Sequence, residues 1–359
     1  MRLAYRYRIY PSKAQVRKLE QWLILCCELY NAALQERRDA YRITGQSISY
    51  CEQQNQLPEI KELRPELKDL HSQVLQDVLR RLDKAFDAFF RRAKARERAG
   101  YPRFRSRSRY DSFTYSQSGF ALSDNKLKLS KIGKVKIKLH RPLKGQVKTL
   151  TITRTATGKW FACFSVEVNT EPLGASLETI GLDCGLEKFA TFSDGTAIEN
   201  PRFFRSDEQA LVKTQRKRKK RQVARIHERI ANRRRNFAHQ LSRSLVITYG
   251  LIVFENLNIQ GMVRNHSLAK SIQDAAWKQL IQFTAYKAAK AGRKVLTVDP
   301  RHTSQRCSRC GQIVAKTLAE RIHHCHCGLH LDRDHNAALN ILALGLQGIG
   351  KLPIEAAPL

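Results

Sequence analysis

The chain has 359 residues, enough for two or three domains, and its 65 Lys and Arg against 32 Asp and Glu give a formal charge of +33. A surplus of this size repels itself unless a polyanion neutralises it, so nucleic acid is the expected partner. No apolar run approaches the roughly 20 residues that a membrane-spanning helix needs, and the N-terminus lacks the apolar core of a signal peptide. We therefore expect a cytoplasmic protein with no membrane partner.

The chain is expected to begin with one strand and two helical stretches. Residues 3–10, LAYRYRIY, alternate Arg with Tyr and apolar residues in the manner of a strand. Ser12 and Gln15 have the spacing of a capping box, which begins a helix that runs to about Gly45. A second helical stretch, at about 66–99, has a broad apolar face and a basic end.

Residues 101–175 change in character and predict an antiparallel β-structure. They first interleave Arg with aromatic residues, in YPRFRSRSRY, and then continue as short alternating strands, the last two of which form a hairpin. We expect a small barrel or sheet, which the strand at 3–10 joins because the helices between look like an insertion. Residues 169–176, NTEPLGAS, have the composition of a linker.

From residue 179 the predicted order is three short strands, a long helix, a strand, a helix and a strand. The long helix is expected at about 207–246. A three-strand meander followed by alternating helices and strands is the order of a ribonuclease-H-like α/β layer. The fold class expected for the whole chain is therefore multidomain α+β.

The predicted long helix has a high density of positive charge. Residues 213–235 carry twelve Lys and Arg and one acid, Glu228. A solvated helix face would explain part of this charge, but so many like charges are costly without a polyanion to neutralise them. We predict nucleic-acid contacts for the densest run, which consists of Lys217, Arg218, Lys219, Lys220 and Arg221.

Four of the nine cysteines are clustered. Two residues separate Cys307 from Cys310, and one residue separates Cys325 from Cys327. Two close pairs of thiolates suit a tetrahedral zinc ion, and four protein ligands leave no open position for chemistry, so we expect structural zinc. Four neighbouring histidines are alternative ligands, namely His323, His324, His326 and His330.

Two acids end strands that are otherwise apolar, and a third acid opens the last helix. Asp183 lies in IGLDCG, Glu255 in LIVFEN, and Asp334 before HNAALNIL. Burying an unpaired carboxylate is expensive, and one such acid alone would most simply be a salt bridge or a turn cap. In the expected α/β layer, however, these three elements meet at one edge, where three carboxylates would bind magnesium or manganese. Two such ions can hydrolyse a phosphodiester.

These acids and cysteines lie in blocks that resemble the signature motifs of the TnpB family, the RuvC-type, RNA-guided nucleases of insertion sequences and relatives of compact type V CRISPR effectors. The blocks are IGLDCGLEKFAT, IVFENLN, DPRHTSQRCSRCG and LDRDHNAALNIL, and the opening of the chain and YPRFRS also match. The resemblance implies that Asp183, Glu255 and Asp334 are the catalytic, metal-binding acids and that Asp332 is an auxiliary or capping acid. It also implies that the four clustered cysteines bind zinc, although the second pair departs from the family's CxxC spacing.

The resemblance further implies a RuvC-like nuclease domain with a zinc-ribbon insertion, and an N-terminal wedge-like β-barrel interrupted by a helical recognition domain. The expected bounds are 1–10 and 100–175 for the barrel, 11–99 for the recognition domain, 176–300 and 331–350 for the nuclease domain, 301–330 for the ribbon and 351–359 for a tail. The N-terminal domains would hold a guide RNA and read a short motif beside the target DNA. Their aromatic residues are able to stack bases and their arginines to hold phosphates, so we predict nucleic-acid contacts for Arg6, Arg8, Arg103 and Arg105.

The function that this resemblance implies is RNA-guided cleavage of double-stranded DNA next to a short adjacent motif. The protein would bind catalytic magnesium or manganese, structural zinc and one guide RNA per monomer, and would be associated with the nucleoid of a prokaryote. One alternative is a DNA transposase, or strand transferase, that uses the same acids. A second is a guided repressor that binds without cutting, which predicts the loss of an acid, whereas all three are present. A third is a plain RNA-binding protein, which would leave the strand-end acids without a role.

Overall fold

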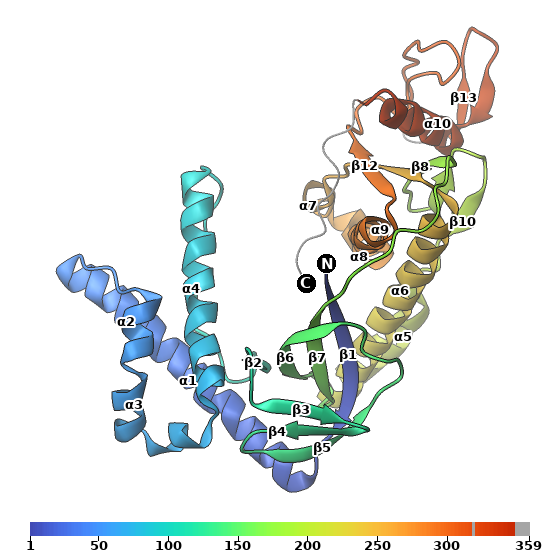
Figure 1. Cartoon of the computed structure of the whole chain (residues 1–359). Helices are drawn as coiled ribbons and strands as arrows, with labels where there is room; N and C mark the ends of the chain where they lie inside the picture. The colour runs from blue at the N-terminus through green and yellow to red at the C-terminus, as the bar shows by residue number, and fades with distance from the viewer. Residues whose placement is uncertain (318–319, 349–359) are drawn as a thin grey trace. The chain divides into compact units, whose positions relative to one another are not determined.

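The computed structural model describes residues 1–317 and 320–348, and the chain divides into two compact units (Figure 1). The first unit spans residues 1–169, and the second begins at Thr170. The tail expected at 351–359 lies outside the described residues. Within the described part of the chain, no helix is both long enough and apolar enough to cross a membrane.

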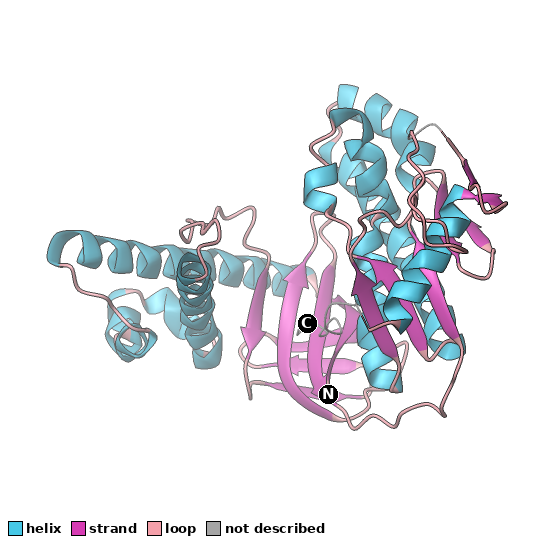
Figure 2. Cartoon of the chain, turned by 90° about the horizontal axis from the view of Figure 1, so that it is seen from above, coloured by secondary structure: helices cyan, strands magenta, loops and turns pink. Residues whose placement is uncertain are grey.

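The first unit contains a seven-stranded antiparallel sheet, whose strands are drawn in magenta in Figure 2. Its strands, in the order β2-β6-β7-β1-β5-β4-β3, are β1 (Arg2–Tyr10), β2 (Ser112–Tyr115), β3 (Phe120–Ser123), β4 (Lys126–Leu129), β5 (Gly133–Lys138), β6 (Gln146–Arg154) and β7 (Trp160–Glu167). Strand β1 pairs with β7 and β5, so the first strand lies in the middle of a sheet made by the region beyond residue 111.

The sheet of the first unit is open in its hydrogen bonding, so of the barrel or sheet expected from the sequence the strand pairing shows a sheet. Its end strands, β2 and β3, are not paired with each other in the described residues. Each of them has only four residues, and they meet through side chains instead, with the ring of Tyr115 lying 6.3 Å from that of Phe120. Short end strands offer too few backbone groups for the hydrogen bonds that would close the sheet into a barrel.

The helices of the first unit follow β1. They are α1 (Lys13–Thr44), α2 (Tyr50–Asn55), α3 (Leu57–Leu63), a short 3-10 helix (Pro65–Asp69) and α4 (Ser72–Lys94). The predicted capping box begins α1, since the Ser12 side chain accepts from the Gln15 amide and the Gln15 side chain accepts from the Ser12 amide. The helix ends at Gly45, which adopts a left-handed φ of 71°. The ring of Trp22 packs 5.3 Å from that of Phe113 and joins α1 to the sheet.

The second unit is built on a five-stranded mixed sheet. Its strands, in the order β10-β9-β8-β11-β12, are β8 (Thr179–Asp183), β9 (Lys188–Phe192), β10 (Ala197–Glu199), β11 (Leu251–Glu255) and β12 (Lys294–Val298). The first three pair antiparallel, and β11 pairs parallel with both β8 and β12. This order is the predicted three-strand meander followed by strands that alternate with helices.

The helices of the second unit are α5 (Phe203–Arg216), α6 (Lys220–Thr248), α7 (Ile259–Met262), α8 (His266–Ala275), α9 (Trp277–Ala291) and α10 (Arg333–Leu346), and a small hairpin is formed by β13 (Ile322–His324) and β14 (His330–Asp332). The prediction of one continuous helix at 207–246 is wrong. The chain turns between α5 and α6, where Arg218 has a left-handed φ of 51°. The break falls within six consecutive basic residues, 216–221, and like charges three and four residues apart repel one another in a helix.

Candidate functional site

The strand-end acids lie on the face of the second sheet that α10 covers. Alternate residues of a strand face opposite sides of the sheet. Leu182 and Phe254, which precede the two acids, lie in the apolar cluster that includes residues of α6 and α9. Asp183 and Glu255 therefore project from the other face, against which α10 packs. Because Leu182 and Phe254 are register partners in the parallel pair of β8 and β11, the acids that follow them lie side by side.

Two glycines allow α10 to lie unusually close to this face. A Cβ atom on Gly181 would lie 2.4 Å from the Ala338 carbonyl oxygen and 2.7 Å from the Leu342 amide nitrogen. A Cβ atom on Gly345, at the far end of α10, would lie 2.5 Å from the Val253 side chain. Neither approach is possible for a residue with a side chain unless the helix or the strand shifts, so these glycines set the height of α10 above β8 and β11.

The first turn of α10 presents the third acid. Asp332 is the N-cap residue, and its Oδ1 accepts from the amides of Asp334 (2.9 Å) and His335 (3.1 Å). This confirms the capping role expected for Asp332. Asp334 is left to face the sheet edge, because its Oδ2 would lie 3.9 Å from a Cβ atom on Gly185, two residues after β8. Its Oδ1 accepts from Arg333 Nε at 3.2 Å.

The three acids influence one another electrostatically. Burial raises the pKa of Asp183 well above its usual range, and the charges of Glu255 and Asp334 raise it further, while Arg333 lowers it. Burial also raises the pKa of Glu255; a hydrogen bond from Thr303 opposes the rise, and the charge of Asp334 adds to it. The structure thus brings the three predicted acids into one neighbourhood, in which Glu255 and Asp334 disfavour the ionisation of Asp183 and Asp334 disfavours that of Glu255. A cation among them would remove this conflict.

The donor set fits a hard divalent cation. Carboxylate oxygens are the ligands that magnesium and manganese prefer, and such ions keep several waters and so do not need a closed protein cage. The arrangement is open: in the described residues, the four cysteines are the only group of three or more His, Cys, Asp or Glu whose ligand atoms all lie within 4.8 Å of one another. The acids therefore form an open candidate site for ions that take only some of their ligands from the protein and the others from water or substrate.

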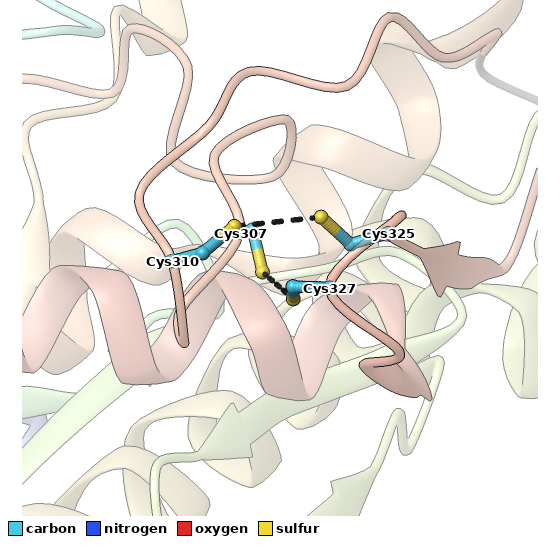
Figure 3. Close-up of side chains that lie close together, drawn as sticks. All are labelled: Cys307, Cys310, Cys325 and Cys327. Carbon is cyan, nitrogen blue, oxygen red and sulfur yellow. Dashed lines mark hydrogen bonds between the residues drawn. The ribbon is translucent and has the colours of Figure 1, made fainter.

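The four clustered cysteines form the second candidate site (Figure 3). The Sγ atoms of Cys307 and Cys327 are 3.6 Å apart, and those of Cys310 and Cys325 are 3.5 Å apart. With Zn–S bonds of about 2.3 Å, tetrahedral geometry places the sulfurs of a zinc site about 3.8 Å from one another. The four thiols therefore match a tetrahedral zinc site.

Each cysteine pair is carried on a tight turn. The amide of Gly311 donates to the Cys307 carbonyl, and the amide of Gly328 donates to the Cys325 carbonyl, both at 2.9 Å. Both glycines have a left-handed φ, 79° and 82°, which favours residues without a side chain. The first turn joins residues four apart and the second joins residues three apart, so the one-residue spacing of the second pair goes with a turn that is shorter by one residue.

The histidines near this cluster are not part of it. His323 is fully buried, its Nδ1 contacts Lys316 Nζ, and its side chain also contacts the Cys307 thiol. His326 Nδ1 lies 3.6 Å from Cys325 Sγ. Burial acts to raise the pKa of the Cys307 thiol, but amide hydrogen bonds and a contact with His323 lower it to about 5, whereas at Cys325 an amide hydrogen bond is outweighed by burial and hydrogen bonds with the other cysteines, which raise the pKa to about 12.

The cysteine turns are attached to α10 by two buried asparagines. The Ser308 amide donates to Asn336 Oδ1 at 3.0 Å, and Asn340 Nδ2 donates to the carbonyls of Thr303 (2.8 Å) and Arg306 (2.6 Å). Thr303 in turn donates its hydroxyl hydrogen to Glu255. A continuous set of hydrogen bonds therefore runs from the cysteine cluster through α10 to a strand-end acid.

The arginines of β1 are partly exposed, whereas the tyrosines that alternate with them are buried. Arg6 and Arg8 are half-buried, and the Arg6 guanidinium lies 3.8 Å from the centre of the Phe161 ring. Tyr5 and Tyr7, which alternate with them, are buried in the core of the first unit. The idea that the aromatics of this strand stack bases is therefore wrong for these two residues, because strand alternation points them inward.

The other predicted nucleic-acid residues are exposed. Arg103 and Arg105 lie in the segment between α4 and β2, where Asn31 exchanges hydrogen bonds of 2.8 Å with the Arg105 amide and carbonyl. Residues 217–221 occupy the turn between α5 and α6 and the start of α6, and all of them are exposed. The structure thus leaves both sets accessible to a polyanion.

Three features of the site were not predicted. Thr303 lies within the block DPRHTSQRCSRCG, and Arg333 within LDRDHNAALNIL, but neither has a sequence pattern that indicates a partner. No sequence pattern indicates the close approach of α10 to Gly181 either. All three depend on which residues face one another across elements far apart in the chain, and only the tertiary arrangement determines that.

Three family models match parts of the chain. They are described as "Helix-turn-helix domain" over residues 1–46, "Probable transposase" over 163–266 and "Cas12f1-like, TNB domain" over 277–341. The first description differs from the local structure, since residues 1–46 form one strand and one continuous helix. The third spans α9, β12, the cysteine cluster and the first part of α10.

Two bacterial proteins, each named "Putative RNA-guided DNA endonuclease", are similar over almost the whole chain. The protein of Streptomyces pristinaespiralis is 35% identical over 363 residues, which cover 96% of this chain and 89% of the relative. InsQ of Escherichia coli is 30% identical over 375 residues, which cover 95% and 92%. A solved complex of Cas12f1 with guide RNA and target DNA aligns with 95% of this chain and 99% of that chain, at 16% identity and a TM-score of 0.37, which is too low for superposing sites.

Proposed function

This chain belongs to the TnpB family, as its similarity to two relatives over their nearly full lengths shows, and we propose that it is a metal-dependent, RNA-guided DNA endonuclease. The observation that carries the proposal is the convergence of Asp183, Glu255 and Asp334 on one face of the second sheet. A protein that only bound nucleic acid would gain nothing from three carboxylates that repel one another and the phosphates nearby.

The chemistry assigned to the acids is hydrolysis of a phosphodiester. Asp183, Glu255 and Asp334 would hold magnesium or manganese, which when bound lowers the pKa of water and neutralises charge on the phosphate oxygens. Thr303 orients the Glu255 carboxylate by its hydrogen bond. Asp332 caps α10 and so fixes the turn that carries Asp334. Arg333 offers positive charge to Asp334 and Asp183 from the same turn.

The cysteine cluster is assigned a structural role. Four thiolates complete the coordination of zinc and leave no position for substrate. The hydrogen bonds of Asn336 and Asn340 attach residues 303–308 to α10, so zinc would stiffen the segment from which Thr303 reaches Glu255. The ribbon at 301–330 would therefore brace the nuclease domain formed by 176–300 and 331–350.

The nucleic-acid partners are assigned from charge and from the names of the relatives. A net charge of +33 and the exposed basic run 217–221 suit nucleic-acid backbones. Pairing with a guide RNA would carry the sequence specificity, while the wedge and recognition domains in residues 1–175 would hold the RNA and read a short motif beside the double-stranded target. We assign one protein per guide RNA and a nucleoid-associated location.

The test begins with the RNA that remains bound to the full-length protein after purification from native-like expression. Sequencing this RNA should reveal one structured species with variable 3′ ends, and plasmids that match those ends should be cut when magnesium is present. Asp183→Ala should still bind the plasmid and should cut nothing. Asp194→Asn, which alters an exposed acid in the turn between β9 and β10, is the matched control and should cut normally. Undiminished cutting by Asp183→Ala would show that the reaction does not depend on these acids.

A DNA transposase that joins strands on the same fold is the second candidate, favoured by the "Probable transposase" description of the family model over 163–266. It would use the same acids. Incubation with the ends of the encoding element should then yield joined strand-transfer products. Simple double-strand breaks at sites that match the bound RNA would support the endonuclease instead.

A further inference from the structure

The end of α4 carries a cluster of aromatic rings that belongs to neither candidate metal site. The Phe89 ring lies 5.2 Å from that of Phe90 and 5.5 Å from that of Tyr101, and the Phe86 ring lies 5.5 Å from that of Tyr101. Only Phe86 is buried, at 9% exposure, and it packs in the core of the first unit. The cluster is thus anchored at one end and projects from the helix at the other.

The outer rings of this cluster are unusually exposed. Phe90 is 59% exposed and Tyr101 is 44% exposed, and Phe104, three residues further on, is 48% exposed. Single exposed apolar residues are common, but several exposed aromatic rings in contact with one another indicate a surface that contacts a partner. We refer to Phe90 and Tyr101, supported from beneath by Phe86 and Phe89, as the aromatic platform.

The charge around the aromatic platform identifies the kind of partner. Residues 91–105 contain seven Lys and Arg and one acid, Glu97, and every one of these charged residues is exposed. The Arg38 guanidinium lies 5.2 Å from the centre of the Phe104 ring. A second copy of the chain would bring the same positive charge against itself, whereas a nucleic-acid strand offers negative phosphates and flat apolar bases together.

We propose that the aromatic platform stacks unpaired bases of a nucleic-acid strand whose phosphates are held by the basic residues of the 91–105 segment. The proposal rests on one part of the proposed function, that the protein binds nucleic acid. It assigns to the end of α4 a base-binding site that does not depend on the sequence of the bases, because every base has a flat face to stack. The contacts of Phe86 and Phe89 keep the outer rings in place, which reduces the entropy lost when a base is bound.

The experiment uses the full-length chain washed free of RNA at high salt, and two probes. One is an oligothymidylate of roughly 16 nucleotides, at the upper end of single-strand site sizes; the other has the same backbone with abasic residues in place of most bases. The variants are Phe90→Leu and Tyr101→Leu, which remove a flat ring but keep an apolar residue, and Phe90→Trp, which keeps a ring. Leu63→Ala, at an exposed apolar position on α3, is the control.

The expected result is a loss that depends on the bases. Phe90→Leu and Tyr101→Leu should each weaken binding of the oligothymidylate between about 5-fold and 100-fold, the range of stacking on an aromatic side chain. Phe90→Trp and Leu63→Ala should bind as the unaltered protein does. With the abasic probe, all of these proteins should bind equally. The salt dependence of binding should stay unchanged in the ring variants, because they remove no phosphate contact.

Four results would overturn the inference. Equal loss on both probes would mean that the rings support the fold and not base stacking, and thermal melting of the variants would report the same. A shift from dimer to monomer in Phe90→Leu, with no effect on the probes, would identify an interface between copies of the chain. Unaltered protein that binds both probes equally would exclude stacking while leaving the endonuclease proposal intact, whereas no binding to either probe would count against both.

Discussion

Replacing Gly181 with alanine should separate the candidate catalytic acids without altering any of them. The added Cβ would lie 2.4 Å from the Ala338 carbonyl oxygen, whereas ordinary contacts begin at 3.4 Å, so α10 or β8 must move by 3.4 − 2.4 = 1.0 Å. The nearest atoms belong to the backbone of α10, which cannot rotate away as the end of a flexible side chain would. The shift is therefore transmitted along the helix to Asp334 in its first turn.

The magnitude has two parts. Overpacking of a close contact costs about 1–3 kcal/mol of stability, which lowers the melting temperature of a unit of this size by roughly 2–4 °C per kcal/mol. A misplacement of about 1 Å at a reacting centre costs on the order of 100-fold in rate. We therefore expect Gly181→Ala to remain folded at moderate temperature and to lose far more activity than stability.

The assay pairs thermal unfolding with cleavage of a plasmid matched to the bound RNA, at a temperature where the variant is folded. Gly174→Ala is the control, because a Cβ at Gly174 meets nothing within 4 Å; it should behave as the unaltered protein. A variant at position 181 that melts several degrees lower yet cuts at the normal rate would refute the reasoning. It would mean that the distance between α10 and β8 does not matter for the chemistry and that Asp334 is not one of the acting acids.

Three further predictions test the two candidate metal sites. Burial and the neighbouring carboxylates raise the pKa of Asp183 above its unfolded value, so without metal the folded state binds more protons than the unfolded state. The free energy of unfolding should therefore fall as pH rises from the ordinary carboxyl range through the raised pKa. Between about pH 4 and about pH 8, this fall should be smaller in Asp183→Asn than in the unaltered protein. Cys310→Ser should lose the zinc found by metal analysis of the purified protein and should melt at a lower temperature, whereas His326→Ala should keep both. Asp332→Ala should lose about 0.5–2 kcal/mol of unfolding free energy through its cap and retain some cutting, whereas Asp334→Asn should keep most of its stability and lose cutting; equal loss of cutting in both would contradict the separate roles assigned to these two acids.

The acids show how far a pattern of residues can predict a site. An acid at the end of an apolar strand is visible in the sequence because burying a carboxylate is expensive; Asp183 and Glu255 were predicted in this way, and they do end β8 and β11. Parallel pairing of β8 and β11 then places both at the same edge of the sheet. Thr303 and Arg333, which lower the pKa values of Glu255 and Asp183, were not predicted. A contact between segments far apart in the chain produces no periodic pattern in the sequence of either segment.

Other predictions were wrong where charge repulsion or tertiary packing outweighed the local sequence pattern. Residues 207–246 have helical periodicity throughout, but the repulsion within 216–221 ends one helix at Arg216 and starts another at Lys220. In β1 the alternation was predicted, but the sequence did not show which of the two faces is buried. The structure places Tyr5 and Tyr7 in the core. Alternation defines two faces, and the packing of the rest of the unit decides which one is buried.

The sequence alone predicted the basic surface, the capping box of α1 and the pairs of cysteines, because each of these depends on composition or on residues that are close in the chain; the class of protein and the roles expected for the acids came from the resemblance to a known family. The tertiary structure decided which groups meet. It brought α10 down onto β8 at Gly181, attached the cysteine turns to that helix through Asn336 and Asn340, and gathered the rings at the end of α4. Contacts of this kind depend on distances of a few ångströms between segments far apart in the chain, and close packing of the whole unit, not local preference, sets those distances.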